Sequence, residues 1–126
     1  MKIAALSTNA HEKEQVLTKA VLNMANFYEL SGKDLSSIIG MSEASTTRLH
    51  QGKKLLSPYT KEGEMALLLL RVYRSLNALV GNNHTKAKAW LTSANRNFES
   101  PPIEKLKTVH GLVEVVNYLD AMRGKI

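Results

Sequence analysis

The chain contains no cysteine. This absence excludes disulfide bonds, thiolate metal ligands and cysteine nucleophiles, and it is typical of proteins that work in the reducing cytoplasm. The chain also lacks a long hydrophobic run, because the longest one, Met65–Leu70, is bounded by Glu64 and Arg71. A membrane-spanning helix needs about 20 apolar residues. The N-terminal apolar patch is likewise too short for a signal-peptide core. We therefore expect a soluble cytoplasmic protein without a membrane partner.

Motifs that carry catalytic or metal chemistry are also missing. Asp34 and Asp120 are the only aspartates, and there is no glycine-rich phosphate loop or nucleophile motif. The histidines show no metal-ligand spacing; they are His11, His50, His84 and His110. We expect no enzymatic activity, no metal and no cofactor.

What the chain does have is enough apolar sequence for a folded core. Of its 126 residues 44% are hydrophobic, which suits one domain or two small ones. The formal net charge is +6, which permits an anionic partner. The excess is spread along the chain, with a net +2 in residues 1–58 and +4 in residues 59–126. The charge alone therefore does not locate a binding site.

The stretch Lys33–Gln51 has the register of a helix-turn-helix. Leu35 and Ile39 lie four residues apart and share one face of a short helix. Gly40 tolerates the left-handed conformation that ends a helix in a sharp turn. Ser42 is a favourable N-cap for a second helix. Two short helices joined by a tight glycine turn form the motif whose second helix enters the DNA major groove.

The second helix of this motif is expected to turn one face inward and the other toward DNA. Thr46 and Leu49 are predicted to face the core, and Gly52 to close the helix. The residues predicted to face DNA are Ser42, Glu43, Ala44, Thr47, Arg48 and Gln51, with Lys53 placed to touch phosphate. A structural helix pair that binds no DNA remains the alternative.

The remaining sequence predicts further helices and no strand. After a loosely held N-terminus, apolar periodicity favours helices over residues 11–30, 61–80 and 85–91, a short one from Ser100-Pro101-Pro102, and a last one capped by Thr108. Pro58 disfavours helix at the preceding residue and marks the boundary. The chain is predicted to be all-α, with about seven helices in two domains, residues 1–58 and 59–126.

Three apolar faces follow from this periodicity. On the first helix, the stripe is Leu17, Val21, Met24 and Tyr28, widened by Val16, Ala20 and Phe27. On the last helix, the predicted face is Val109, Val113, Val116 and Leu119. The third face is broad and offers a surface for a homodimer; it comprises Leu68, Leu69, Val72 and Leu76. A dimer would place two recognition helices about 34 Å apart along the duplex.

The sequence from Ala89 onward carries a regularly spaced motif, whose residues are Trp90, Leu91, Asn95, Phe98, Pro102, Leu106, Gly111, Val115 and Leu119. This motif resembles the toxin-binding domain of the Xre/MbcA/ParS antitoxin family. The resemblance covers roughly residues 65–126, and the upstream half resembles the Xre-type helix-turn-helix. The sequence departs from the pattern at Glu99-Ser100, where many relatives carry glycine. Physically, the large apolar motif residues are most simply core, Asn95 can bond its own loop backbone, and Gly111 permits close helix approach.

The resemblance implies an antitoxin. Its partner would be a RES-domain toxin, an enzyme that degrades NAD⁺, and the antitoxin would cover the active-site cleft while its other half represses the operon. The candidate toxin-binding residues are Asn95, Arg96, Ser100 and Pro102, with Arg123, Gly124 and Lys125 at the basic tail. Two alternatives remain: a stand-alone regulator without a toxin, and a protein scaffold that no longer binds DNA.

Overall fold

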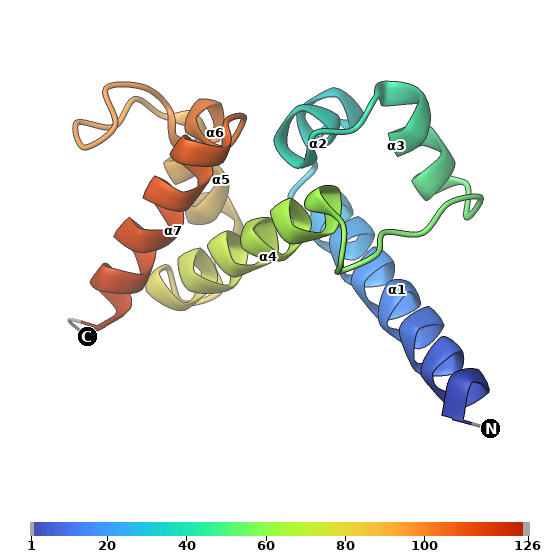
Figure 1. The fold of residues 1–126 in the computed structure, drawn as a ribbon. Helices are drawn as coiled ribbons and strands as arrows, with labels where there is room; N and C mark the ends of the chain where they lie inside the picture. The colour runs from blue at the N-terminus through green and yellow to red at the C-terminus, as the bar shows by residue number, and fades with distance from the viewer. Residues whose placement is uncertain (1, 125–126) are drawn as a thin grey trace. The chain divides into compact units, whose positions relative to one another are not determined.

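The computed structural model describes residues 2–124, with side chains from residue 9 onward. These residues form seven α-helices and no strand, which confirms the predicted all-α fold (Figure 1). The helices are α1 (Lys2–Phe27), α2 (Gly32–Ile39), α3 (Glu43–His50), α4 (Lys61–Leu79), α5 (His84–Thr92), α6 (Pro102–Lys105) and α7 (Val109–Gly124). No helix in this described range combines the length and the apolar character needed to cross a bilayer.

Contacts within the chain group into two compact units. Unit 1 comprises residues 1–67 and unit 2 comprises residues 68–126, so the division falls inside α4. The domain boundary that the sequence analysis placed after residue 58 remains a prediction.

The long helix α1 supplies the core of unit 1. It begins at Lys2, although the sequence predicted a start near His11. The upstream residues contain alanine and leucine but no glycine or proline, and they therefore extend a helix readily. The predicted apolar stripe is confirmed, because its four members are buried: Leu17, Val21, Met24 and Tyr28.

The predicted widening of this stripe is wrong at two positions. Val16 is 69% exposed and Phe27 is 57% exposed. Each lies one residue from a buried position, which turns it about 100° round the helix and out of the core. The buried polar residue Thr18 takes part in the core instead, since its Oγ1 accepts a hydrogen bond of 2.7 Å from the backbone N–H of Leu56. This bond fastens the connection after α3 to α1.

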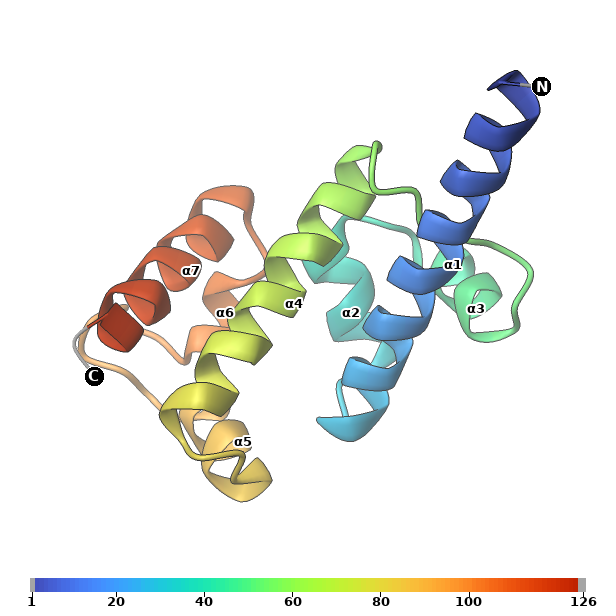
Figure 2. The same ribbon diagram turned by 90° about the horizontal axis from the view of Figure 1, so that it is seen from below.

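Helices α2 and α3 lie beside α1 and contact each other (Figures 1 and 2). Ser31 caps α2, with its Oγ accepting from the N–H of Asp34 at 3.0 Å. Gly40 ends α2 in the left-handed conformation with φ of 77°. The inward residues of this pair are buried, as predicted for a helix-turn-helix; they are Leu35, Ile39, Thr46 and Leu49.

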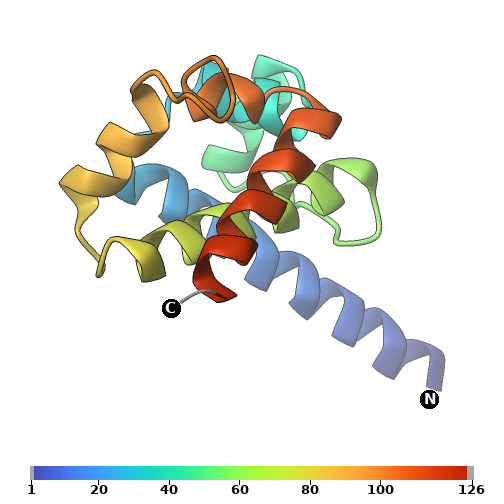
Figure 3. The same ribbon diagram turned by 90° about the vertical axis from the view of Figure 1, so that its left-hand side faces the viewer.

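Unit 2 contains the second part of α4 together with α5, α6 and α7 (Figure 3). Helix α6 contacts both α5 and α7. The core consists mainly of leucine and valine side chains with two aromatic rings; its members are Leu69, Val72, Tyr73, Leu76, Ala87, Leu91, Phe98, Leu106, Leu112, Val115, Val116 and Leu119.

Two predictions about apolar faces are corrected in this unit. Val109 is 62% exposed and Val113 is 39% exposed, so the last helix buries Leu112 and Val115 in their place. The buried side is rotated because α7 carries apolar residues on most of its circumference, and packing selects one side. The homodimer surface predicted on α4 is also wrong, since Leu69, Val72 and Leu76 are buried within the chain itself; only Leu68 is half-buried.

Candidate functional site

Helix α3, the predicted recognition helix, is held at both ends by local hydrogen bonds. At its start, Ser42 Oγ accepts from the N–H of Ser45 at 3.0 Å. At its end, Gly52 takes a φ of 75°, and the N–H of Lys53 donates to the carbonyl of Arg48 at 2.9 Å. These contacts fix the length of α3 and the direction in which the chain leaves it.

All the predicted DNA-facing residues are exposed. This holds for Ser42, Glu43, Ala44, Thr47, Arg48, Gln51 and Lys53. Thr47 Oγ1 donates to the carbonyl of Glu43 at 3.0 Å, and the Arg48 guanidinium donates to Ser45 Oγ at 3.0 Å. The Arg48 contact lies on the helix surface, so the guanidinium can exchange it for a base or phosphate at little cost. The face is therefore formed and accessible, although its contact with DNA stays a prediction.

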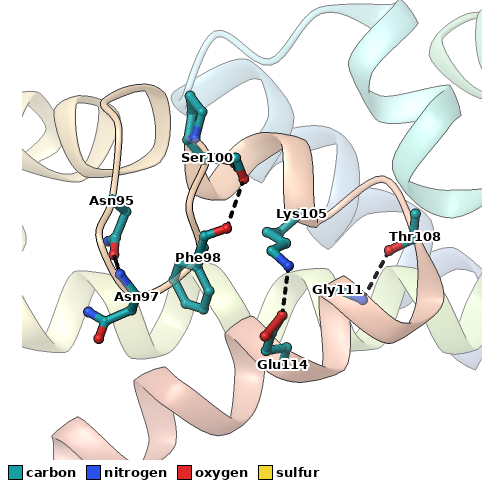
Figure 4. A network of polar contacts seen from close by, with 9 residues as sticks. Asn95, Asn97, Phe98, Ser100, Lys105, Thr108, Gly111 and Glu114 are labelled. Carbon is teal, nitrogen blue, oxygen red and sulfur yellow. Dashed lines mark hydrogen bonds and ion pairs between the residues drawn. The ribbon is translucent and has the colours of Figure 1, made fainter.

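The loop from Asn95 to Ser100 is closed by its own hydrogen bonds (Figure 4). Asn95 Oδ1 accepts from the N–H of Asn97 at 2.8 Å, as predicted for a loop-bracing asparagine. The carbonyl of Asn95 also accepts from the N–H of Glu99 at 2.9 Å. Glu99 has a φ of 57°, in the left-handed region that favours glycine. The loop thus keeps a left-handed turn at the position where the sequence departs from the family pattern.

The predicted toxin-binding residues in this loop differ in accessibility. Arg96 is exposed, while Asn95 and Ser100 are half-buried. Pro102 is buried at the start of α6, where it supports the loop instead of presenting surface. Of this group, Arg96 offers a partner the most accessible polar side chain.

The turn between α6 and α7 depends on Gly111. A Cβ added at Gly111 would lie 2.1 Å from the carbonyl oxygen of Lys105, so the close approach predicted there is confirmed. Thr108 caps α7, with its Oγ1 accepting from the N–H of Gly111 at 3.0 Å. Lys105 Nζ pairs with Glu114 Oε2 at 3.1 Å across the same turn (Figure 4).

The end of α7 is tied to α4 through a polar cluster. Ser75, which is fully buried, donates from Oγ to Asp120 Oδ1 at 3.0 Å and accepts from the Arg123 guanidinium at 3.1 Å. Arg71 forms an ion pair with Asp120. Arg123 is therefore positioned by its own chain, and Gly124 beside it is exposed. Lys125, the remaining predicted tail residue, lies outside the described residues.

An aromatic cluster joins the loop to α7. The ring of Trp90 lies 6.2 Å from that of Phe98 and 6.3 Å from that of Tyr118, and Asn97 Nδ2 donates to Tyr118 Oη at 3.2 Å. Sequence reasoning assigned no role to Asn97 or Tyr118. Their contact spans 21 positions, and no local pattern signals it. Among the described side chains, no group of histidine, aspartate or glutamate is arranged to hold a metal ion.

Comparison with known families matches both halves of the chain. Residues 7–71 match the antitoxin Xre-like helix-turn-helix domain. Residues 75–125 match the antitoxin Xre/MbcA/ParS C-terminal toxin-binding domain. No match was found among curated proteins. The first match covers more than half of the chain and includes α2 and α3, and the second includes the loop, α6 and α7. The chain belongs to the Xre-like antitoxin family, with a helix-turn-helix domain followed by an Xre/MbcA/ParS toxin-binding domain.

Proposed function

We propose that this antitoxin neutralises a RES-domain toxin, an NAD⁺-degrading enzyme, by covering its active-site cleft, and that it represses its own operon. The observation that carries the proposal is the succession of a helix-turn-helix domain and a toxin-binding domain in one chain. Occlusion requires surface and no catalysis, in keeping with the lack of catalytic motifs in the sequence. Binding of the antitoxin to its operator would take place in the cytoplasm.

The two activities are proposed to reside in different parts of the chain. DNA binding is assigned to residues 1–58 and toxin binding to residues 59–126. A cut at this point leaves α4 whole, because that helix begins at Lys61. A homodimer is also proposed, since one helix-turn-helix covers one half-site and two are needed for a palindromic operator.

The neutralising activity is tested by co-expression of this chain with the proposed RES-domain toxin. Cells that produce the toxin alone should stop growing and lose NAD⁺, and the full-length antitoxin should restore both. Deleting residues 125–126 should weaken protection if the basic tail enters the cleft. The fold should be unaffected, because Arg123 keeps its contact with Ser75 in this variant. Continued loss of NAD⁺ with the full-length antitoxin present would contradict the proposal.

The DNA activity is tested by replacing Arg48 with alanine. Arg48 is exposed on α3, and its Ser45 contact is local, so the substitution should leave the fold intact. Binding to the promoter of the antitoxin operon should weaken by about 1–3 kcal/mol if the guanidinium reads a base bidentately. Mobility-shift titration at fixed salt measures this loss, and Lys86→Ala, at an exposed position on α5, provides the control. Unchanged affinity would remove Arg48 from the interface.

A stand-alone regulator without a toxin is the second candidate function. The exposed face of α3 would serve it equally well. A stand-alone regulator should bind its promoter but give no protection from a RES-domain toxin, so the two assays separate the candidates.

A further inference from the structure

Between Val109 and Ala121, the exposed residues of α7 all lie on one side of the helix, and none of them is acidic or basic apart from a histidine. This outer α7 face consists of Val109, His110, Val113, Asn117 and Ala121. It lies opposite the buried positions of α7, among them Leu112 and Val115. Its ends are 12 residues apart, or about 18 Å along the helix axis.

The charges beside this face are paired within the chain. Glu114 Oε2 lies 3.1 Å from Lys105 Nζ. Asp120 pairs with Arg71 and accepts from Ser75 Oγ at 3.0 Å. An apolar partner could therefore approach the outer α7 face without leaving an uncompensated carboxylate at its edge, which would be costly.

The exposed surfaces of the other helices in unit 2 differ from this one. α4 exposes Arg71 and Arg74, and α5 exposes Lys86. Within the described part of unit 2, Val109 and Val113 are the large hydrophobic residues left exposed. Single exposed valines are common, but two on adjacent turns of an uncharged face point to contact with a partner.

The occupant follows from the family to which this part of the chain belongs. The toxin-binding domain matches residues 75–125, and this range includes all of α7. We propose that the outer α7 face is the centre of the toxin-binding surface and that it docks against an uncharged, apolar patch of the toxin. This inference rests on the proposed function, that the chain binds a RES-domain toxin.

The size of the face agrees with a central position in a larger interface. A specific interface buries about 800 Å² on each partner, which is more than five mostly small side chains provide. The loop from Asn95 to Ser100 can supply additional area, because Asn97 Nδ2 reaches Tyr118 Oη on α7 at 3.2 Å. The exposed Arg96 would then belong to the polar rim.

The inference is tested by placing a charge of either sign in the middle of the face. Val113→Asp and Val113→Lys should both fold normally, since Val113 is already 39% exposed. Each should weaken binding to a catalytically inactive form of the proposed RES-domain toxin by at least about 30-fold, because the introduced charge must be buried. Calorimetric titration of the full-length chain measures the affinity, and thermal melts confirm folding.

The matched controls are Ala89→Asp and Ala89→Lys, at an exposed position on α5. They should bind within a factor of about two of the wild type, because surface substitutions outside an interface have small effects. Loss of affinity in only one of the Val113 variants would indicate a charge effect and overturn apolar docking.

The outcomes separate this inference from the proposed function. If the wild-type chain does not bind the toxin, the proposed function fails. If the wild type binds and both Val113 variants bind equally well, the outer α7 face is not the interface, while the proposed function stands. If the variants lose self-association but keep toxin affinity, a second copy of this chain occupies the face, and the inference is overturned.

Discussion

Replacing Gly63 with alanine should lower the free energy of unfolding by about 3 kcal/mol. A Cβ at this position would lie 1.7 Å from the carbonyl oxygen of Ser57 and 3.0 Å from the Cα of Pro58. Both atoms belong to backbone, which cannot move aside by changing a rotamer. The N–H of Gly63 also donates to Thr60 Oγ1 at 3.1 Å, and Thr60 Oγ1 donates to the Ser57 carbonyl at 2.9 Å. The first turn of α4 is thereby held against the preceding connection.

Gly32→Ala is the matched control for this substitution. Gly32 also lies in the first turn of a helix, and no atom lies within 4 Å of the Cβ that alanine would add. Its stability should stay within about 1 kcal/mol of the wild type or rise, because alanine has the higher helix propensity. Urea unfolding followed by circular dichroism measures both variants. If Gly63→Ala is as stable as Gly32→Ala, the close contact with Ser57 is not present in solution.

Leu112→Ala should cost about 3 kcal/mol, whereas Val113→Ala should cost less than about 0.5 kcal/mol. The difference follows from burial, since Leu112 is fully buried and Val113 is 39% exposed. Alanine at residue 112 leaves a cavity in unit 2, while alanine at residue 113 removes contacts mainly with solvent. Urea unfolding of the two variants compares their free energies of unfolding and so shows which side of α7 is buried. A larger loss for Val113→Ala would mean that the face predicted from sequence is the buried one.

The helix ends were predictable because the interactions that form them are local. Ser42 and Thr108 each accept a hydrogen bond from an N–H three residues ahead, and Gly40 adopts the left-handed conformation next to its own helix. Residue type and spacing therefore contain the required information. The same reasoning accounts for the correct inward placement of Thr46 and Leu49 in the short helix α3.

The buried side of α7 was not predictable from periodicity. Val109, Leu112, Val113, Val115 and Val116 surround much of the helix, so more than one apolar stripe can be drawn through them. Which stripe becomes core depends on the elements packed against it, and that choice is tertiary. The error at Val16 and Phe27 in α1 has the same cause.

The candidate site also contains residues that were predictable from the sequence and contacts that were not. The exposed residues of α3 follow from helix geometry once the helix-turn-helix register is recognised. The contacts Ser75–Asp120 and Asn97–Tyr118 join residues 45 and 21 positions apart, and no local signal announces them. The tail residue Arg123 was chosen for its charge, but its contact with Ser75 depends on the folded unit.

We propose that this antitoxin neutralises a RES-domain toxin by occluding its active site. The measurement that tests it most directly is the rate of NAD⁺ hydrolysis by the purified RES-domain toxin as the purified antitoxin is added. We expect hydrolysis to fall in proportion to the complex formed and to stop at saturation, with a catalytically inactive toxin competing for the antitoxin and restoring the rate. Undiminished hydrolysis in a toxin saturated with antitoxin would contradict occlusion.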